Sequence, residues 1–167
     1  NNILLAGGAD LEVRLHDVRA TGSVAKFDGS VSDIEHISVN PALPHLFVSS
    51  SRDGQARIYD MRRSDSDRVV ETPSDNIHGI NQTVFSRDGR WLYSALQKKS
   101  WSIFDAYTGR LVKEIDGHQD IVSCISVSPT SGDICTGSKD KSVILWSAKL
   151  PTYHTKTIRS LSASISD

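Results

Sequence analysis

Short runs of alternating apolar and polar residues recur along the 167-residue chain, and turn-forming residues separate them. Ile37-Ser38-Val39 and Ile125-Ser126-Val127 are two such runs, and a proline follows each of them. Because side chains alternate between the two faces of a strand, this pattern predicts β-strands with one buried face. No long segment with the apolar spacing of an amphipathic helix lies between these runs. The chain is therefore predicted to be all-β.

The same arrangement occurs four times along the chain. Four strand-like runs end in an aromatic or imidazole residue followed by Asp17, Asp60, Asp105 or Ser147, at spacings of 43, 45 and 42 positions. A turn residue precedes each of these by seven positions, namely Asp10, Asp53, Lys98 or Asp140. A repeat of this length is typical of architectures in which small sheets stack on their neighbours.

Each complete unit is predicted to be a four-stranded antiparallel meander. In the last unit we expect strands over 121–127, 133–137 and 142–146, and a weaker fourth strand after Trp146. A sheet of this size has two faces to bury, and stacking around a common axis buries both.

The last unit carries the most specific residues. They are Gly117-His118, Ser128-Pro129, Thr136-Gly137-Ser138-Lys139-Asp140 and Leu145-Trp146-Ser147. With them the sequence resembles the WD-repeat family of β-propellers, over nearly the whole chain to about Leu150. The resemblance implies an all-β propeller of four-stranded antiparallel blades, here a partial ring of nearly four. The implied units are a propeller segment over 1–150 (a partial blade 1–28 and blades 29–74, 75–116 and 117–159) and a Ser-rich tail 160–167.

An open ring is expected from the same resemblance. Propellers have about four to eight blades, and the first unit here lacks its innermost strand. The chain begins within a predicted strand and without an initiator Met. We expect the rest of a propeller, or a partner chain, to complete the ring.

A hydrogen-bonded structural tetrad is implied in the last blade. It would link Trp146 to Thr136, Thr136 to His118, and His118 to Asp140. The other units place His16, Tyr59 and Phe104 at the Trp position, so the tetrad can be complete only in the last blade.

The same His, Thr and Asp also resemble a nucleophilic triad, which would need an exposed hydroxyl beside an oxyanion hole. Their spacing favours the structural network, so the chain is predicted not to be an enzyme.

Composition and motif searches argue against several classes of ligand. The net charge of −1 argues against a generally basic nucleic-acid binder, and no apolar run approaches the ~20 residues of a membrane-spanning helix. The six histidines are scattered, without zinc-ligand spacing, and no phosphate-binding or dinucleotide-binding glycine motif occurs. No cofactor, metal or membrane partner is predicted.

The two cysteines are predicted to be free. A hairpin centred near Thr130 would place Cys124 opposite Thr136 and Cys135 opposite Ile125. The thiols would then lie on opposite faces of the sheet and could not bond. Free, half-buried thiols indicate a reducing compartment, so the chain is expected to be intracellular, nuclear or cytoplasmic.

Two sets of basic residues are candidate partner-binding sites. Asp-x-Arg follows the third strand in consecutive units and places Arg19 and Arg62 at equivalent corners. This resembles the paired WDxR boxes with which WD-repeat substrate receptors of cullin–RING ubiquitin ligases contact the ligase adaptor. The alternative is that each Arg bonds neighbouring backbone. The second set is expected to cluster on one edge and consists of Lys98, Lys99, Lys139 and Lys141. It would bind an acidic partner or phosphate, or form solvated surface.

The predicted function is a non-enzymatic protein–protein interaction scaffold or adaptor subunit of a larger complex. Rigid sheets that display variable loops suit the binding of several partners. Two alternatives remain open: a substrate receptor of a cullin–RING ubiquitin ligase, and an RNA- or ribonucleoprotein-binding propeller that uses the lysine turns.

Overall fold

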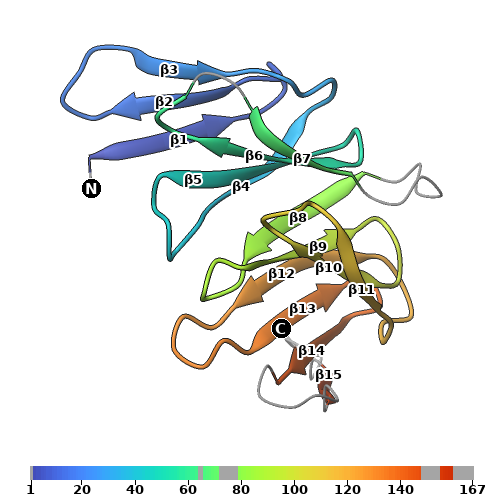
Figure 1. Cartoon of the computed structure of the whole chain (residues 1–167). Helices are drawn as coiled ribbons and strands as arrows, with labels where there is room; N and C mark the ends of the chain where they lie inside the picture. The colour runs from blue at the N-terminus through green and yellow to red at the C-terminus, as the bar shows by residue number, and fades with distance from the viewer. Residues whose placement is uncertain (1, 64–65, 72–78, 148–154, 160–167) are drawn as a thin grey trace, which may run out of the picture.

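The computed structural model describes residues 2–63, 66–71, 79–147 and 155–159, and none of these lies in a helix (Figure 1). Fifteen strands are present in the described residues. They are β1 (Ile3–Gly7), β2 (Val13–Asp17), β3 (Ser23–Phe27), β4 (Ile34–Val39), β5 (Leu46–Ser51), β6 (Gln55–Asp60), β7 (Ser66–Glu71), β8 (Ile80–Phe85), β9 (Trp91–Leu96), β10 (Trp101–Asp105), β11 (Leu111–Ile115), β12 (Val122–Val127), β13 (Ile134–Ser138), β14 (Ser142–Trp146) and β15 (Thr155–Arg159).

The strands form four antiparallel meanders. The first sheet has the order β1-β2-β3, and the other three are β4-β5-β6-β7, β8-β9-β10-β11 and β12-β13-β14-β15. Within each sheet, every strand pairs with the next along the chain, as hairpin connections require. The predicted all-β fold of four-stranded blades in an open ring is confirmed. The predicted tail 160–167 lies outside the described residues.

The sheets stack side by side, and β8 lies between β4 and β12 (Figure 1). Three apolar cores fill the spaces between successive sheets. The core between the first and second sheets includes Val13, Leu15, Phe27, Phe47 and Tyr59. The core between the second and third includes Val48, Ile58, Leu92 and Phe104. Each middle sheet is therefore apolar on both faces.

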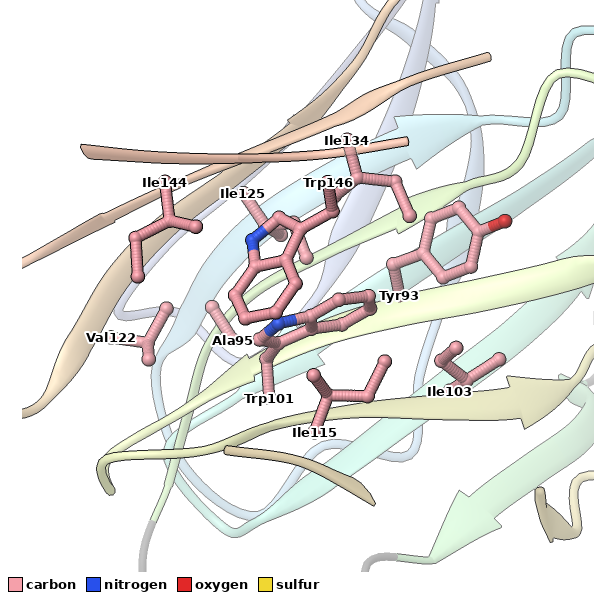
Figure 2. Close-up of a cluster of buried hydrophobic side chains, with 10 residues drawn as sticks. All are labelled: Tyr93, Ala95, Trp101, Ile103, Ile115, Val122, Ile125, Ile134, Ile144 and Trp146. Carbon is pink, nitrogen blue, oxygen red and sulfur yellow. The ribbon is translucent and has the colours of Figure 1, made fainter. Parts of the chain in front are cut away.

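The core between the third and fourth sheets contains the largest aromatic side chains. The ring centroids of Trp101 and Trp146 lie 5.4 Å apart, and those of Trp101 and Tyr93 lie 5.9 Å apart with perpendicular planes (Figure 2). Edge-to-face contacts of this kind stabilise aromatic pairs beyond the burial of their surface. Trp101 comes from β10 and Trp146 from β14, so this contact joins two sheets.

Aspartates shape the turn between the second and third strands of each of two blades. The Asp53 carboxylate accepts a hydrogen bond from the Gln55 N–H at 2.9 Å, and Asp140 accepts one from the Ser142 N–H at 2.8 Å. The residue after the Asp takes a left-handed backbone, with φ of 83° at Gly54 and 66° at Lys141. Asp suits this position because its short side chain bonds the backbone two residues ahead.

The cysteine register differs from the sequence-based prediction. Cys124 lies opposite Gly137, and Cys135 lies opposite Ser126. Residues directly opposite share a face, and so do residues two apart in a strand. Both cysteines therefore lie on the same face, so the predicted opposite placement is wrong. The turn between β12 and β13 holds one residue more than a hairpin centred on Thr130 would, and one residue reverses the alternation.

Both thiols are free in the structure, and Cys124 is exposed rather than half-buried. Burial, and then the neighbouring Cys124, raise the pKa of the Cys135 thiol. In the part of the chain that the structure describes, no helix is long and apolar enough to span a membrane.

Candidate interaction surfaces

Four side chains of the last blade form a continuous hydrogen-bonded chain. The Trp146 indole N–H donates to the Thr136 hydroxyl at 2.9 Å, and Thr136 Oγ1 lies 2.8 Å from His118 Nε2. His118 Nδ1 lies 3.0 Å from an Asp140 carboxylate oxygen. Burial opposes ionisation of Asp140, but hydrogen bonds from Ser142, Gln119 and His118 hold its pKa well below the usual range. The network ties the loop before β12 to β13 and β14.

Thr136 and His118 are too enclosed for chemistry on a substrate. Thr136 has no exposed surface, and His118 is 4% exposed. A nucleophilic hydroxyl must reach a substrate, so this arrangement supports a structural network.

Gly117 precedes the histidine because the Trp146 ring passes close to its backbone. A Cβ at this position would lie 2.7 Å from Cη2 of Trp146. Only glycine therefore allows the backbone before His118 to lie this close to the indole ring.

In the second blade, an arginine of β6 rather than a histidine pairs with the turn aspartate. The Arg57 guanidinium forms an ion pair with Asp53 at 2.9 Å, and their side chains are 6% and 7% exposed. Asp53 stands at the position of Asp140 in the repeat, and Tyr59 stands at the position of Trp146. The Tyr59 hydroxyl donates to the Asp28 carbonyl at 3.1 Å instead of to a threonine.

Sequence comparison of the units did not single out Arg57. The signal was available, because the first two units share the spacing Asp-x-x-x-Arg at Asp10/Arg14 and Asp53/Arg57. Arg14 also pairs with Asp10, at 2.7 Å, but its side chain is 40% exposed.

The two Asp-x-Arg corners have the same geometry. In each, the guanidinium folds back on the Asp two residues earlier. Arg19 Nη2 lies 2.7 Å from Asp17, and Arg62 Nη2 lies 2.6 Å from Asp60. The Nε–H and the backbone N–H of each Arg also donate to the same carboxylate. Hydrogen bonds from the guanidinium lower the pKa of both aspartates.

These corner arginines remain at the surface. Their side chains are 70% and 67% exposed. The alternative from the sequence was that each Arg bonds neighbouring backbone. In the structure, the guanidinium of Arg19 instead pairs with the Asp17 carboxylate, and that of Arg62 pairs with the Asp60 carboxylate.

The four lysines of the predicted basic cluster differ in exposure and in pairing. Lys98 forms an ion pair with Glu114 of β11, and its side chain is only 22% exposed. Burial raises the pKa of Glu114, but hydrogen bonds from Lys98 and Ser100 outweigh this effect and hold the pKa below its ordinary value. Lys99 and Lys139 are exposed, and Lys141 takes the left-handed backbone described above. One of the four predicted basic groups is thus paired within its own blade.

Hydrogen bonds connect the innermost strands of three blades. His36 Nδ1 donates to the Thr83 carbonyl at 3.1 Å, and His36 Nε2 lies 3.0 Å from the Gln82 amide nitrogen. The Gln82 amide oxygen in turn accepts from the Ile125 N–H at 3.0 Å. One glutamine of β8 therefore fixes the position of β4 and β12 on either side of it.

A groove runs along these same strands, and we call it the inner-strand groove. Its walls come from β4, β8 and β12 and from the turns that follow them. The lining includes His36, Val39, Gln82, Arg87, Ser126 and Pro129. Three blades contribute to it, so it exists only because the sheets are stacked.

Comparison with known proteins identifies the repeats. Residues 21–60 and 109–147 match the sequence model of the family described as "WD domain, G-beta repeat". Each match runs from the outermost strand of one sheet through three strands of the next, β3 to β6 and β11 to β14.

Curated relatives are named as subunits of a guanine nucleotide-binding protein. The chain is 27% identical over 154 residues to the subunit beta of Zea mays, which covers 87% of this chain and 40% of that protein. It is 28% identical over 152 residues to the subunit beta of Arabidopsis thaliana, with the same coverage. Against that of Schizosaccharomyces pombe it is 33% identical over 102 residues, 61% of this chain and 32% of that protein.

The chain thus spans about 40% of the length of the plant relatives. Two matched repeats, four stacked antiparallel sheets and these relatives agree with one another. The chain carries WD40 repeats, and its stacked sheets form an open ring.

Proposed function

We propose that the chain is a non-enzymatic protein-interaction scaffold within a multi-subunit complex, and that a protein partner binds at the inner-strand groove. The groove carries this proposal because three separate blades build it. The names of the relatives support it, since each is a subunit of a larger assembly.

The chemistry of the groove suits a protein surface. Val39 is 45% exposed and Pro129 is also exposed, while His36, Gln82 and Ser126 supply polar atoms. Protein interfaces combine apolar contacts with a limited number of hydrogen bonds in this way. The hydrogen bonds through Gln82 hold the three strands in fixed positions, so little conformational entropy is lost when a partner binds.

The test compares two substitutions on the same strand. Ser126 and Ser123 are both exposed on β12, but only Ser126 lines the groove. Tagged chain carrying Ser126→Arg should lose a co-purifying protein, while Ser123→Arg should retain it, with unchanged melting temperatures. Equal retention by both variants would show that the groove does not bind the partner.

A ligase-receptor function has less support from the corner geometry. Each corner guanidinium already forms a fork with Asp17 or Asp60, so an adaptor would have to share or replace that pair. The RNA-binding alternative is weakened in the same way at Lys98, whose charge is paired with Glu114.

A further inference from the structure

Three turns at equivalent positions in successive blades form one end of the inner-strand groove. The second residue after the innermost strand is Pro41 in the second blade, Arg87 in the third and Pro129 in the fourth. All three residues line the groove and are exposed. The turns that follow β4, β8 and β12 lie along the same side of the stacked sheets (Figure 1). In the order of the blades, an arginine therefore stands between two prolines.

Side chains hold these three turns in fixed positions. Asn40 is buried, and its amide N–H donates to the Gly89 carbonyl in the turn after β8 at 3.2 Å. The Arg87 guanidinium in turn donates to the Thr130 carbonyl in the turn after β12. Each of these bonds crosses from one blade to the next. The guanidinium is thus held in place before a partner binds, which reduces the entropy lost on binding.

Arg87 has no carboxylate partner in the part of the chain that the structure describes. Its neighbour Asp88 accepts instead from the Ser86 hydroxyl and from the Arg90 backbone N–H. Four other arginines each pair with an aspartate, namely Arg14, Arg19, Arg57 and Arg62. The described lining of the groove contains no Asp, Glu or Lys. Arg87 therefore gives this groove a permanent positive charge that no acidic side chain of the lining balances.

We propose that the inner-strand groove selects a peptide segment of the partner protein in which an acidic residue lies between apolar residues, and that the acidic side chain pairs with Arg87. A guanidinium binds a carboxylate through short, charge-assisted hydrogen bonds. The exposed Pro41 and Pro129 contact the apolar residues on either side. Because the groove is the same site, this selectivity rests on the proposed function.

The site is independent of the three-stranded first sheet. Its walls and turns belong to the second, third and fourth sheets, each of which has four strands. The pairing of Arg87 with an acidic residue thus depends on the contact between complete sheets.

A random heptapeptide library displayed on phage is the probe. The purified chain should enrich peptides that carry Asp or Glu flanked by apolar residues. In the same selection, the Arg87→Glu variant should enrich Lys or Arg in place of the acidic residue. Arg110→Glu is the matched control, because Arg110 is also exposed but does not line the groove. It should select the same peptides as the unchanged chain.

One enriched peptide, synthesised with a fluorescent label, measures the contact itself by anisotropy. Replacing its acidic residue with the corresponding amide should weaken binding by about tenfold or more, as expected for the loss of a charge-assisted hydrogen bond. Arg87→Gln should weaken binding by a similar factor. The two changes together should cost little more than either alone, because both remove the same contact.

The outcomes distinguish this selectivity from the proposed function. Peptides that bind the Ser123→Arg variant but not the Ser126→Arg variant show binding at the groove. If such peptides lack an acidic residue, or if Arg87→Glu selects the same peptides as the unchanged chain, the proposed selectivity is wrong while the groove remains a binding site. If no enriched peptide depends on Ser126, the selectivity is also wrong, and co-purification with the Ser126→Arg variant decides the proposed function separately.

Discussion

Arg57 and Asp53 form an ion pair that is almost fully buried between the first and second sheets. The equivalent pair of Arg14 and Asp10 has the same spacing in the sequence, but no sheet of the described residues packs over it, and its side chains are 40% and 42% exposed. The same pair of residue types thus stands in two environments within one molecule.

This difference predicts unequal effects of the same substitution. Arg57→Met should lower the free energy of unfolding by about 3–5 kcal/mol, because it leaves the Asp53 carboxylate buried without its partner. Arg14→Met should cost less than about 1 kcal/mol, since water can solvate Asp10. Urea titration of both variants measures the difference. Similar losses would mean that the Arg57 ion pair is not buried as described.

Trp146→Ala should destabilise the chain more than Phe104→Ala. Loss of a buried aromatic side chain costs about 3–5 kcal/mol in either blade. Trp146→Ala additionally removes the donor to Thr136 in a buried network, which adds about 1–3 kcal/mol. Denaturant titrations of the two variants compare these losses. If Phe104→Ala costs as much or more, the tetrad does not contribute to stability.

Gly117→Ala should destabilise the last blade by about 1–3 kcal/mol, because the added methyl group overlaps the Trp146 ring. Gly8→Ala is the matched control, since a Cβ there would contact nothing within 4 Å. Thermal melts of the two variants should separate clearly. Equal melting temperatures would contradict the close approach of the indole to Gly117.

Acid should weaken the contact between the second and third blades through His36. Burial lowers the pKa of His36 in the folded chain below the 6.5 of a solvated imidazole. The unfolded chain therefore binds more protons, and stability falls as the pH decreases through about 6.5 towards the folded pKa. A protonated Nε2 would also face the Gln82 amide nitrogen, which is itself a donor.

The substitution His36→Gln should reduce this acid sensitivity. Urea unfolding at about pH 8 and about pH 5 measures the slope, because histidine changes charge in this range. An identical pH dependence in the wild-type chain and the His36→Gln variant would exclude His36 as its source.

The repeated strand pattern was sufficient to predict the sheets, because each unit buries alternate residues and ends at a glycine or aspartate turn. The hydrogen bonds of Trp146, Thr136, His118 and Asp140 could likewise be anticipated, since all four residues stand at the spacing of the resemblance. The strand pattern recurs with a fixed period, and the four tetrad residues all lie within one unit.

Three features could not be predicted from the sequence. They depend on the length of one turn, on which strand supplies a side chain, or on the rotamer of one residue. One additional turn residue reversed the face of Cys135 relative to Cys124, and no propensity distinguishes the two registers. Arg57 reaches Asp53 from β6, whereas His118 reaches Asp140 from the loop before β12, so alignment by column does not reveal it. The fork between Arg62 and Asp60 depends on a side-chain rotamer, which the sequence does not specify.

The native mass of the chain in cells that express it tests the scaffold function most directly. Size-exclusion chromatography followed by native mass spectrometry of the tagged chain would give the composition of its assembly. A scaffold should be recovered in a stoichiometric complex that contains this chain and at least one different protein. Recovery of the chain alone, or only with copies of itself, would contradict it.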